Sequence, residues 1–149
     1  MKKVLAFGTF DILHPGHTYM LKAAKKLGDH LTVIVARDAT VYKIKGEKAL
    51  FNEKTRLKNL ARLNIADKVR LGCLGNKYKV ITDEKPNVIA LGYDQKIFVD
   101  DLKNVVDHRH SEATPHGGGK KIQIVRLKSY KPEIYKSSKL RTKKVFNQK

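Results

Sequence analysis

The sequence Ala6-Phe7-Gly8-Thr9-Phe10-Asp11-Ile12-Leu13-His14-Pro15-Gly16-His17 contains the residues from which the architecture of this chain can be inferred. The apolar run that leads to its first glycine, residues 4–7, is typical of a buried strand. Residues 18–27 predict a helix that ends at Gly28, a residue type common at helix ends. Pro15 suits the first turn of this helix, because no intrahelical bond needs an N–H there. We therefore expect a strand, a turn containing glycine and the beginning of a helix.

The beginning of this helix is suited to binding phosphate. Backbone N–H groups without intrahelical partners and the positive end of the helix dipole lie at such a terminus. His14 and His17 are three residues apart there, so both imidazoles can face one phosphate, as hydrogen-bond donors or as cations. The alternatives are ordinary helix capping and a metal site built on the pair. No third ligand of obvious spacing accompanies them for a metal.

Length and composition set the class of protein. With 149 residues, of which 41% are hydrophobic, the chain fits one globular domain over residues 1–149. No apolar run approaches the ~20 residues that cross a bilayer, and the first one is too short for a signal peptide. We therefore expect a cytoplasmic protein with no membrane partner. The single cysteine, Cys73, excludes an internal disulfide and a cysteine-based zinc site, and is read as a small core residue.

The charge of the chain predicts an anionic ligand. Its 32 Lys and Arg residues exceed its 14 Asp and Glu residues, so the formal net charge is +18. Such an excess attracts nucleic acid or a nucleoside triphosphate with a phosphorylated acceptor. The chain has no Trp and lacks the interleaved aromatic residues of a base-stacking surface. Charge alone does not choose between these ligands, and most of the lysines are expected to form a solvated surface.

Strand-like and helix-like segments alternate along the chain. Further strands are predicted at residues 31–36, 68–72, 87–91 and 121–127. Helices are predicted from the N-cap Asn52 and over residues 76–84, 98–106 and 139–146, and residues 40–48 predict a loop or a short helix. This order predicts an α/β three-layer sandwich with a mainly parallel sheet of five strands. Ligands bind such sheets at the carboxyl ends of the strands.

The motif Gly8-Thr9-Phe10-Asp11 followed by His14-Pro15-Gly16-His17 resembles that of the nucleotidyltransferases with an HxGH signature. Members of this superfamily transfer a nucleoside monophosphate from a triphosphate to a phosphorylated acceptor and release pyrophosphate. The small members most similar to this chain are glycerol-3-phosphate cytidylyltransferases and archaeal-type FAD synthases. The resemblance implies a Rossmann-like fold with the site across the carboxyl ends of the strands. Because small relatives are often dimers, it also implies a homodimer.

The resemblance assigns expected roles to residues of the first turn. It implies nucleotide contacts from Thr9 and Phe10, and phosphate contacts from His14 and His17 with the backbone of Pro15 and Gly16 close by. As catalytic residues it implies the two histidines together with two lysines.

For some of the basic residues, a position on the solvent-exposed surface without a catalytic role is an alternative to the role that the resemblance implies. Lys25 falls where relatives carry a lysine in an Ala-Lys pair, and a solvated helix lysine is the alternative. Either Lys43 or Lys45 corresponds to the lysine of a basic loop that reaches toward the triphosphate, and we predict that Lys45 is the catalytic one. Arg56 stands where relatives have an arginine that opens the next helix, with a surface arginine as the alternative.

Later motifs favour one branch of the superfamily. Leu91-Gly92-Tyr93-Asp94-Gln95 is similar to a Leu-Gly-x-Asp-Gln motif of archaeal-type FAD synthases, which implies that Asp94 contacts the nucleotide. Tyr130 corresponds to a tyrosine that can stack on a base, and Ser137 and Ser138 to hydroxyls placed against the phosphates. The cytidylyltransferase form of that last motif has an arginine where this chain has Lys128.

We therefore expect transfer of AMP from ATP to FMN, giving FAD and pyrophosphate by direct in-line attack. A divalent cation, Mg²⁺, is expected to neutralise the triphosphate. CTP-dependent glycerol-3-phosphate cytidylyl transfer is the nearest alternative. A basic nucleic-acid-binding module is an alternative of another class, although we do not expect nucleic acid as the partner. A relative that binds nucleotide without catalysis is a third alternative.

Overall fold

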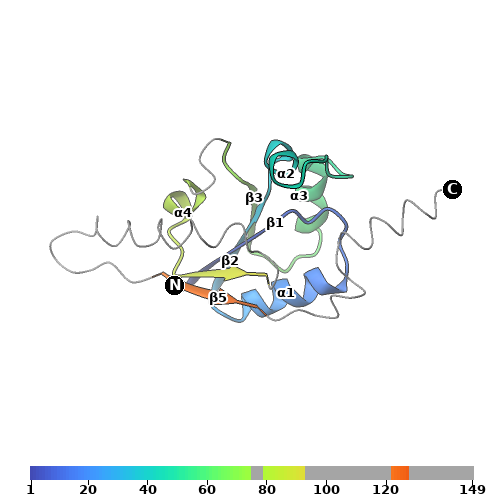
Figure 1. Ribbon diagram of the computed structural model, residues 1–149. Helices are drawn as coiled ribbons and strands as arrows, with labels where there is room; N and C mark the ends of the chain where they lie inside the picture. The colour runs from blue at the N-terminus through green and yellow to red at the C-terminus, as the bar shows by residue number, and fades with distance from the viewer. Residues whose placement is uncertain (75–78, 93–121, 128–149) are drawn as a thin grey trace.

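The computed structural model describes residues 1–74, 79–92 and 122–127 (Figure 1). The elements of these ranges follow the chain in the order β1 (Lys3–Gly8), α1 (Pro15–Lys25), β2 (His30–Val35), α2 (Asp38–Lys45), α3 (Glu53–Ala61), β3 (Lys68–Leu71), α4 (Lys79–Glu84), β4 (Val88–Leu91) and β5 (Gln123–Arg126). All five predicted strands are present within two residues of their expected bounds. The predicted helices over 98–106 and 139–146 lie outside the described residues.

The five strands form one sheet with the order β3-β2-β1-β4-β5, and every neighbouring pair is parallel. Ala6 in the middle of β1 pairs with Val33 of β2 on one side and with Ala90 of β4 on the other. The chain builds the sheet outward from β1 to β3 and then returns to place β4 on the other side of β1. The direction of winding therefore reverses between β1 and β4. The predicted α/β fold with a parallel sheet is confirmed.

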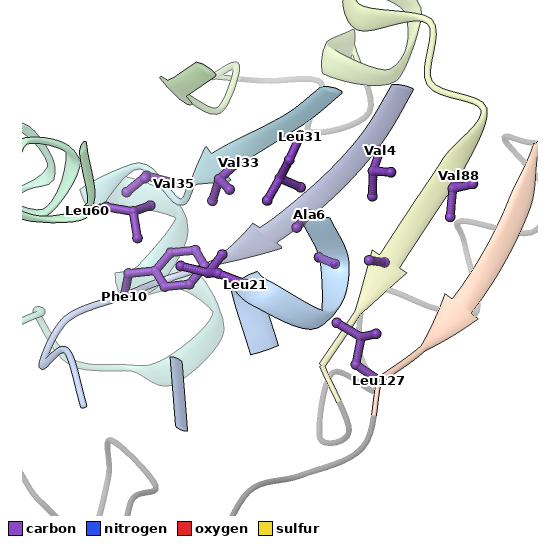
Figure 2. Close-up of a cluster of buried hydrophobic side chains, with 12 residues drawn as sticks. Val4, Ala6, Phe10, Leu21, Leu31, Val33, Val35, Leu60, Val88 and Leu127 are labelled. Atoms are coloured by element: carbon purple, nitrogen blue, oxygen red, sulfur yellow. The ribbon is translucent and has the colours of Figure 1, made fainter. Parts of the chain in front are cut away.

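Both faces of the sheet are covered, which explains why its central strands are apolar at successive positions. One core cluster places Val4 and Ala6 of β1 against Leu21 of α1 and Leu60 of α3 (Figure 2). A second cluster on the other face contains Leu5 and Phe7 of β1, Ile89 of β4, and Val80 and Ile81 of α4. Figure 1 shows α1 and α4 on opposite sides of the sheet. The described part of the molecule thus has three layers, as the sequence predicts.

Local signals place the helix ends. Pro15 occupies the first position of α1, and the Asn52 side chain accepts a hydrogen bond of 2.8 Å from the N–H of Thr55 at the start of α3. Both predictions of helix starts are confirmed. The segment expected to be a loop or a short helix is the helix α2, which ends at Gly46 with φ of 73°. Glycine adopts this left-handed conformation without strain. No helix among the described ranges is long and apolar enough to span a membrane.

Candidate active site

The carboxyl ends of the parallel strands bring three loops to one edge of the sheet. The strands β1, β2 and β4 end there at Gly8, Val35 and Leu91. The carbonyl of Gly8 accepts a hydrogen bond of 2.9 Å from the N–H of Ala36, which holds the ends of β1 and β2 together. In open parallel sheets, ligands bind where the winding direction reverses. Here that position lies between β1 and β4, directly at the turn that carries the two histidines.

His14 and His17 lie together at this edge. Their ring centroids are 3.9 Å apart and their planes are inclined by 30°. His14 is the N-cap of α1, and its Nδ1 accepts a hydrogen bond of 3.1 Å from the N–H of Gly16. A ring nitrogen that accepts a hydrogen bond carries no proton, so the neutral His14 ring has its proton on Nε2. His14 therefore caps the helix, as one alternative expects, and this bond uses only Nδ1, so it does not involve the Nε2–H of the same ring.

This geometry changes the expected phosphate contacts. The sequence predicts backbone N–H groups without partners at the start of α1, but the N–H of Gly16 bonds to the imidazole of His14. The N–H of His17 bonds to the carbonyl of His14 at 3.0 Å. These two backbone N–H groups are thus already used by His14. A phosphate that binds here would therefore depend more on the ring N–H groups than on these backbone N–H groups.

Burial keeps both rings uncharged. It lowers the pKa of His17 from its ordinary value of 6.5 to about 3, and the positive charges that His14 and Lys45 can carry lower it further in the same direction. Burial also lowers the pKa of His14. At neutral pH the ligand-free protein therefore offers these side chains as neutral hydrogen-bond donors. Of the two modes that the sequence leaves open, donor or cation, the structure supports the donor.

A group whose pKa is lower in the folded state than in the unfolded state destabilises the fold at acid pH. Below pH 6.5 the unfolded chain binds a proton at His17 that the folded chain excludes until about pH 3. Between pH 7 and pH 4.5 we expect the wild type to lose about 2–3 kcal/mol more unfolding free energy than His17→Gln. Urea titrations at the two pH values measure this difference. His30→Gln, at the other edge of the sheet, is the control, and parallel losses in wild type and His17→Gln would contradict the prediction.

Phe10 supports the histidines from inside the protein. Its side chain is 2% exposed and belongs to the core cluster of Figure 2, beside Leu21. The ring lies 5.3 Å from that of His17, inclined by 58°. The Phe10 side chain is thus packed inside the protein, and the predicted contact between Phe10 and the nucleotide stays a prediction that falls to its backbone. Its backbone, at φ of 54°, instead shapes the turn.

Thr9, Pro15 and Gly16 remain at the edge of the sheet where the sequence places them. Pro15 is exposed, and Thr9 and Gly16 are partly exposed. The carbonyl of Thr9 accepts a hydrogen bond of 2.8 Å from Arg56. These three residues frame the two imidazoles, and their contacts with a nucleotide stay a prediction.

Arg56 is neither a surface residue nor a residue open to phosphate. It is fully buried, and its guanidinium donates three hydrogen bonds. Nη1 donates to the carbonyl of Thr9 at 2.8 Å, Nε to the carbonyl of Phe51 at 3.0 Å, and Nη2 to Oδ1 of Asp38 at 2.7 Å. The surface arginine that the sequence leaves as one alternative is therefore wrong, whereas Arg56 does lie in the first turn of α3, where the resemblance expects an arginine that opens the helix. Burial of a residue of this type depends on partners up to 47 positions away, which no local pattern reveals.

Asp11 is a residue whose role sequence reasoning missed. Its buried carboxylate accepts hydrogen bonds from the N–H groups of Leu50 at 2.8 Å and Phe51 at 2.9 Å. It therefore joins the turn after β1 to the segment between α2 and α3. A carboxylate in the middle of an apolar turn was the available signal, because a buried acid needs donors.

The first residues of α2 and α3 cap each other. The N–H of Asp38 donates to Oε1 of Glu53, and the N–H of Glu53 donates to Oδ2 of Asp38, both at 3.1 Å. Arg37 Nε lies 2.8 Å from the second Glu53 oxygen. Partial burial tends to raise the pKa of Asp38, but the hydrogen bonds from Arg56 and Glu53 and the nearby arginine charges outweigh it and hold that pKa below its usual value. Arg37 and Asp38 thus fasten two helices at the carboxyl end of β2.

The lysines predicted as catalytic lie on two different helices, Lys43 and Lys45 on α2 and Lys25 on α1. Lys43 and Lys45 are both exposed in the last turn of α2. The charge of Lys45 contributes to the lowered pKa of His17, and Lys43 is not among the causes. The choice of Lys45 over Lys43 as the catalytic lysine stays a prediction.

Lys25 is not brought to the same place. It is the last residue of α1, about 15 Å along the helix from the histidines. There it forms an ion pair with Asp67 and bonds to the carbonyl of Asp29 at 3.4 Å. The side chain is thus used at the amino edge of the sheet, and we do not include it in the candidate site.

The remaining predicted contacts, Asp94, Tyr130, Ser137 and Ser138, lie outside the described residues. Within the described ranges, no group of three or more His, Cys, Asp or Glu side chains could hold a metal ion. Asp11 is the buried carboxylate in the turn after β1, and both of its oxygens accept hydrogen bonds from backbone N–H groups. The described residues therefore do not form a site that fits Mg²⁺ by itself.

The chain matches the cytidylyltransferase-like family over residues 5–143. A protein of Aciduliprofundum boonei named FAD synthase is 42% identical over 130 residues, which is 87% of this chain and 80% of the relative. The FAD synthase of Thermoplasma volcanium is 38% identical over 143 residues, or 96% of this chain and 94% of the relative.

Solved structures share the fold. A Thermoplasma volcanium protein described as a lipopolysaccharide core biosynthesis protein is 39% identical, with a TM-score of 0.74 over 87% of this chain and 98% of that one. An Archaeoglobus fulgidus protein of unknown function, 22% identical, has a TM-score of 0.63 over 86% of this chain and 90% of that one, and it supports the fold alone.

Proposed function

The chain belongs to the cytidylyltransferase-like family, and from this premise we propose that it is an FAD synthase. It transfers AMP from ATP to FMN and releases pyrophosphate. The observation that carries this proposal is the identity of 38–42% with proteins named FAD synthase over 87–96% of the chain. The paired imidazoles at the carboxyl edge of β1 supply a matching place for a triphosphate.

The reaction needs no nucleophile from the protein. A phosphate oxygen of FMN attacks the α-phosphorus of ATP, and the bond from that phosphorus to the oxygen bridging to the β-phosphate breaks. The electron pair leaves with pyrophosphate, so negative charge grows on the leaving oxygens. The protein must align the two phosphates and stabilise that charge. This requirement suits donors and cations and explains why no nucleophile–base pair is needed.

We assign the stabilising role to His14, His17 and Lys45. Neutral imidazoles donate through a ring N–H without the cost of burying a second charge beside a lysine. Lys45 adds a positive charge on the side of His17. Thr9, Pro15 and Gly16 frame this group, and Asp94, Tyr130, Ser137 and Ser138 are kept as proposed nucleotide contacts on the resemblance of their motifs.

A divalent cation, Mg²⁺, is proposed to arrive with the triphosphate. When bound there, it would neutralise phosphate charge. Among the described residues no group of three or more His, Cys, Asp or Glu side chains is placed to hold it. The cytoplasmic location, the single domain and the homodimer expected from the sequence stay predictions.

The substrate pair is tested directly with the purified full chain and Mg²⁺. We expect pyrophosphate and FAD from ATP plus FMN, and neither cytidylyl transfer from CTP to glycerol 3-phosphate nor turnover with ATP plus glycerol 3-phosphate. Chromatography of the flavins and an enzymatic pyrophosphate assay follow the products. Turnover with CTP and glycerol 3-phosphate but not with ATP and FMN would replace the proposal by its nearest alternative. ATP binding without any pyrophosphate would indicate a non-catalytic relative.

A further inference from the structure

Arg56 joins three parts of the chain that are distant in sequence. It bonds to Thr9 in the turn after β1, to Phe51 before α3 and to Asp38 at the start of α2. The side chain is fully buried, and burying a guanidinium is costly even when it is paired. An apolar residue would fill the same position of α3 at lower cost. The guanidinium at this position therefore connects three segments of the chain, which packing of α3 alone does not require.

Asp11 makes a second connection between the same two regions. Its carboxylate reaches from the turn after β1 to the N–H groups of Leu50 and Phe51. Phe51 thus donates through its N–H to Asp11 and accepts through its carbonyl from Arg56. The segment between α2 and α3 is held against the histidine-bearing turn by an acid from one side and a guanidinium from the other.

Lys45 depends on these connections for its placement. It is exposed in the last turn of α2, and in the described parts of the chain no hydrogen bond or ion pair fixes its side chain. Leu50, five residues beyond Lys45, donates to Asp11, three residues before His14, so the chain that follows α2 lies against the histidine-bearing turn. The position of α2, anchored at Asp38 by Arg56 and followed by the segment that Asp11 holds, therefore sets where the lysine stands.

We propose that Arg56 is a positioning residue for nucleotidyl transfer, which sets where Lys45 stands relative to His14 and His17 by joining α2 and the segment before α3 to the turn after β1. This inference rests on the proposed function, because it concerns the same site. Arg56 touches no substrate and acts through Lys45. Misplacing a reacting or stabilising group by about 1 Å can cost ~10²-fold in rate.

The substitution Arg56→Lys tests whether the three hydrogen bonds of the guanidinium matter, as distinct from its positive charge. Lysine keeps the positive charge, but its single ammonium cannot reproduce the planar fork that serves Thr9, Phe51 and Asp38 at once. We expect the variant to fold and to lose about 10²-fold in kcat. Arg62→Lys, an exposed position just beyond the other end of α3, is the matched control and should retain wild-type kinetics.

A double-mutant cycle of Arg56→Lys and Lys45→Ala distinguishes positioning from a merely structural role. If Arg56 acts through Lys45, the double variant should be within about threefold of Lys45→Ala alone, because the lysine it positions is already absent. Losses that multiply would overturn the inference, as would wild-type kinetics in a folded Arg56→Lys. Should Arg56→Lys fail to fold, Asp38→Ala takes its place in the cycle, because this acceptor is 45% exposed and its loss leaves Arg56 in place.

ATP affinity distinguishes failure of this inference from failure of the proposed function. The cycle is run on the dissociation constant of ATP, measured by calorimetry, as well as on FAD formation. If the wild type makes no FAD but its ATP affinity shows the same coupling, the proposed function fails and the positioning role stands. If FAD forms and the two substitutions act independently in both measurements, the proposed function stands and the positioning role fails.

Discussion

Replacing both His14 and His17 with alanine is expected to lower kcat for FAD formation by about 10³-fold or more, with the fold retained. The two neighbouring rings, which the structure places at the carboxyl edge of β1, are the donors that we propose for the phosphates. Removing one preorganised donor to a developing charge typically costs about 10²–10³-fold in kcat. Two donors that act on the same phosphates should cost more than one, although their effects need not multiply. Steady-state pyrophosphate release measures the loss.

The stability of the double variant is an internal check on this result. His14 caps α1 through its Nδ1, so its removal should cost about 0.5–2 kcal/mol of unfolding free energy without unfolding the protein. His30→Ala, at the start of β2 on the opposite edge of the sheet, is the matched control and should retain activity. A folded double variant with near wild-type turnover would remove the two histidines from the mechanism. Salt-sensitive binding to DNA or RNA that survives the double change would favour a nucleic-acid-binding module.

Gly8→Ala is expected to destabilise the protein and to impair catalysis together. A Cβ at this position would lie 2.6 Å and 2.7 Å from two ring atoms of Phe10. The ring has no room to retreat, because Phe10 is 2% exposed, in the core, and its backbone is held at φ of 54°. We expect a loss of about 1–3 kcal/mol from overpacking. Because the same turn carries the histidines, we also expect about a 10²-fold fall in kcat.

The controls for Gly8→Ala use the same edge of the sheet. At Gly72, which follows β3, an added Cβ would meet its nearest atom, Cγ2 of Ile34, at 3.6 Å, an ordinary contact. Gly72→Ala should therefore change the unfolding free energy by no more than about 0.5 kcal/mol. Phe10→Leu in the Gly8→Ala background makes room for the methyl group and should recover part of the stability. Equal unfolding midpoints of Gly8→Ala and Gly72→Ala in urea would contradict the steric explanation.

Several features of the fold follow from short-range patterns. The strands could be predicted because buried parallel strands are apolar at successive positions, as in Val4, Leu5, Ala6 and Phe7. The helix starts at Pro15 and Asn52 could be predicted because capping is made by residues within three positions of the end. The same is true of the turn that brings His14 and His17 together, because their spacing alone sets them on one side of a helix start.

Other features depend on partners that the local pattern does not contain. The burial of Arg56 needs Thr9 and Asp38, and the burial of Phe10 needs the core beneath α1. Lys25 was expected in the site because of its neighbours in sequence, but α1 carries it about 15 Å away to Asp67. A sequence motif predicts which residue types take part in a reaction, but the direction of the helix decides where each side chain lies.

The sequence by itself determined that this is a parallel α/β protein with an HxGH turn after its first strand, because hydrophobic periodicity and capping act over a few residues. The tertiary structure alone decided the strand order, the burial of the histidines and the ion pair that Lys25 forms with Asp67. Those features come from desolvation and hydrogen bonds between distant segments. Burial lowers the pKa of His17, and the guanidinium of Arg56 anchors the start of α2 to the turn after β1.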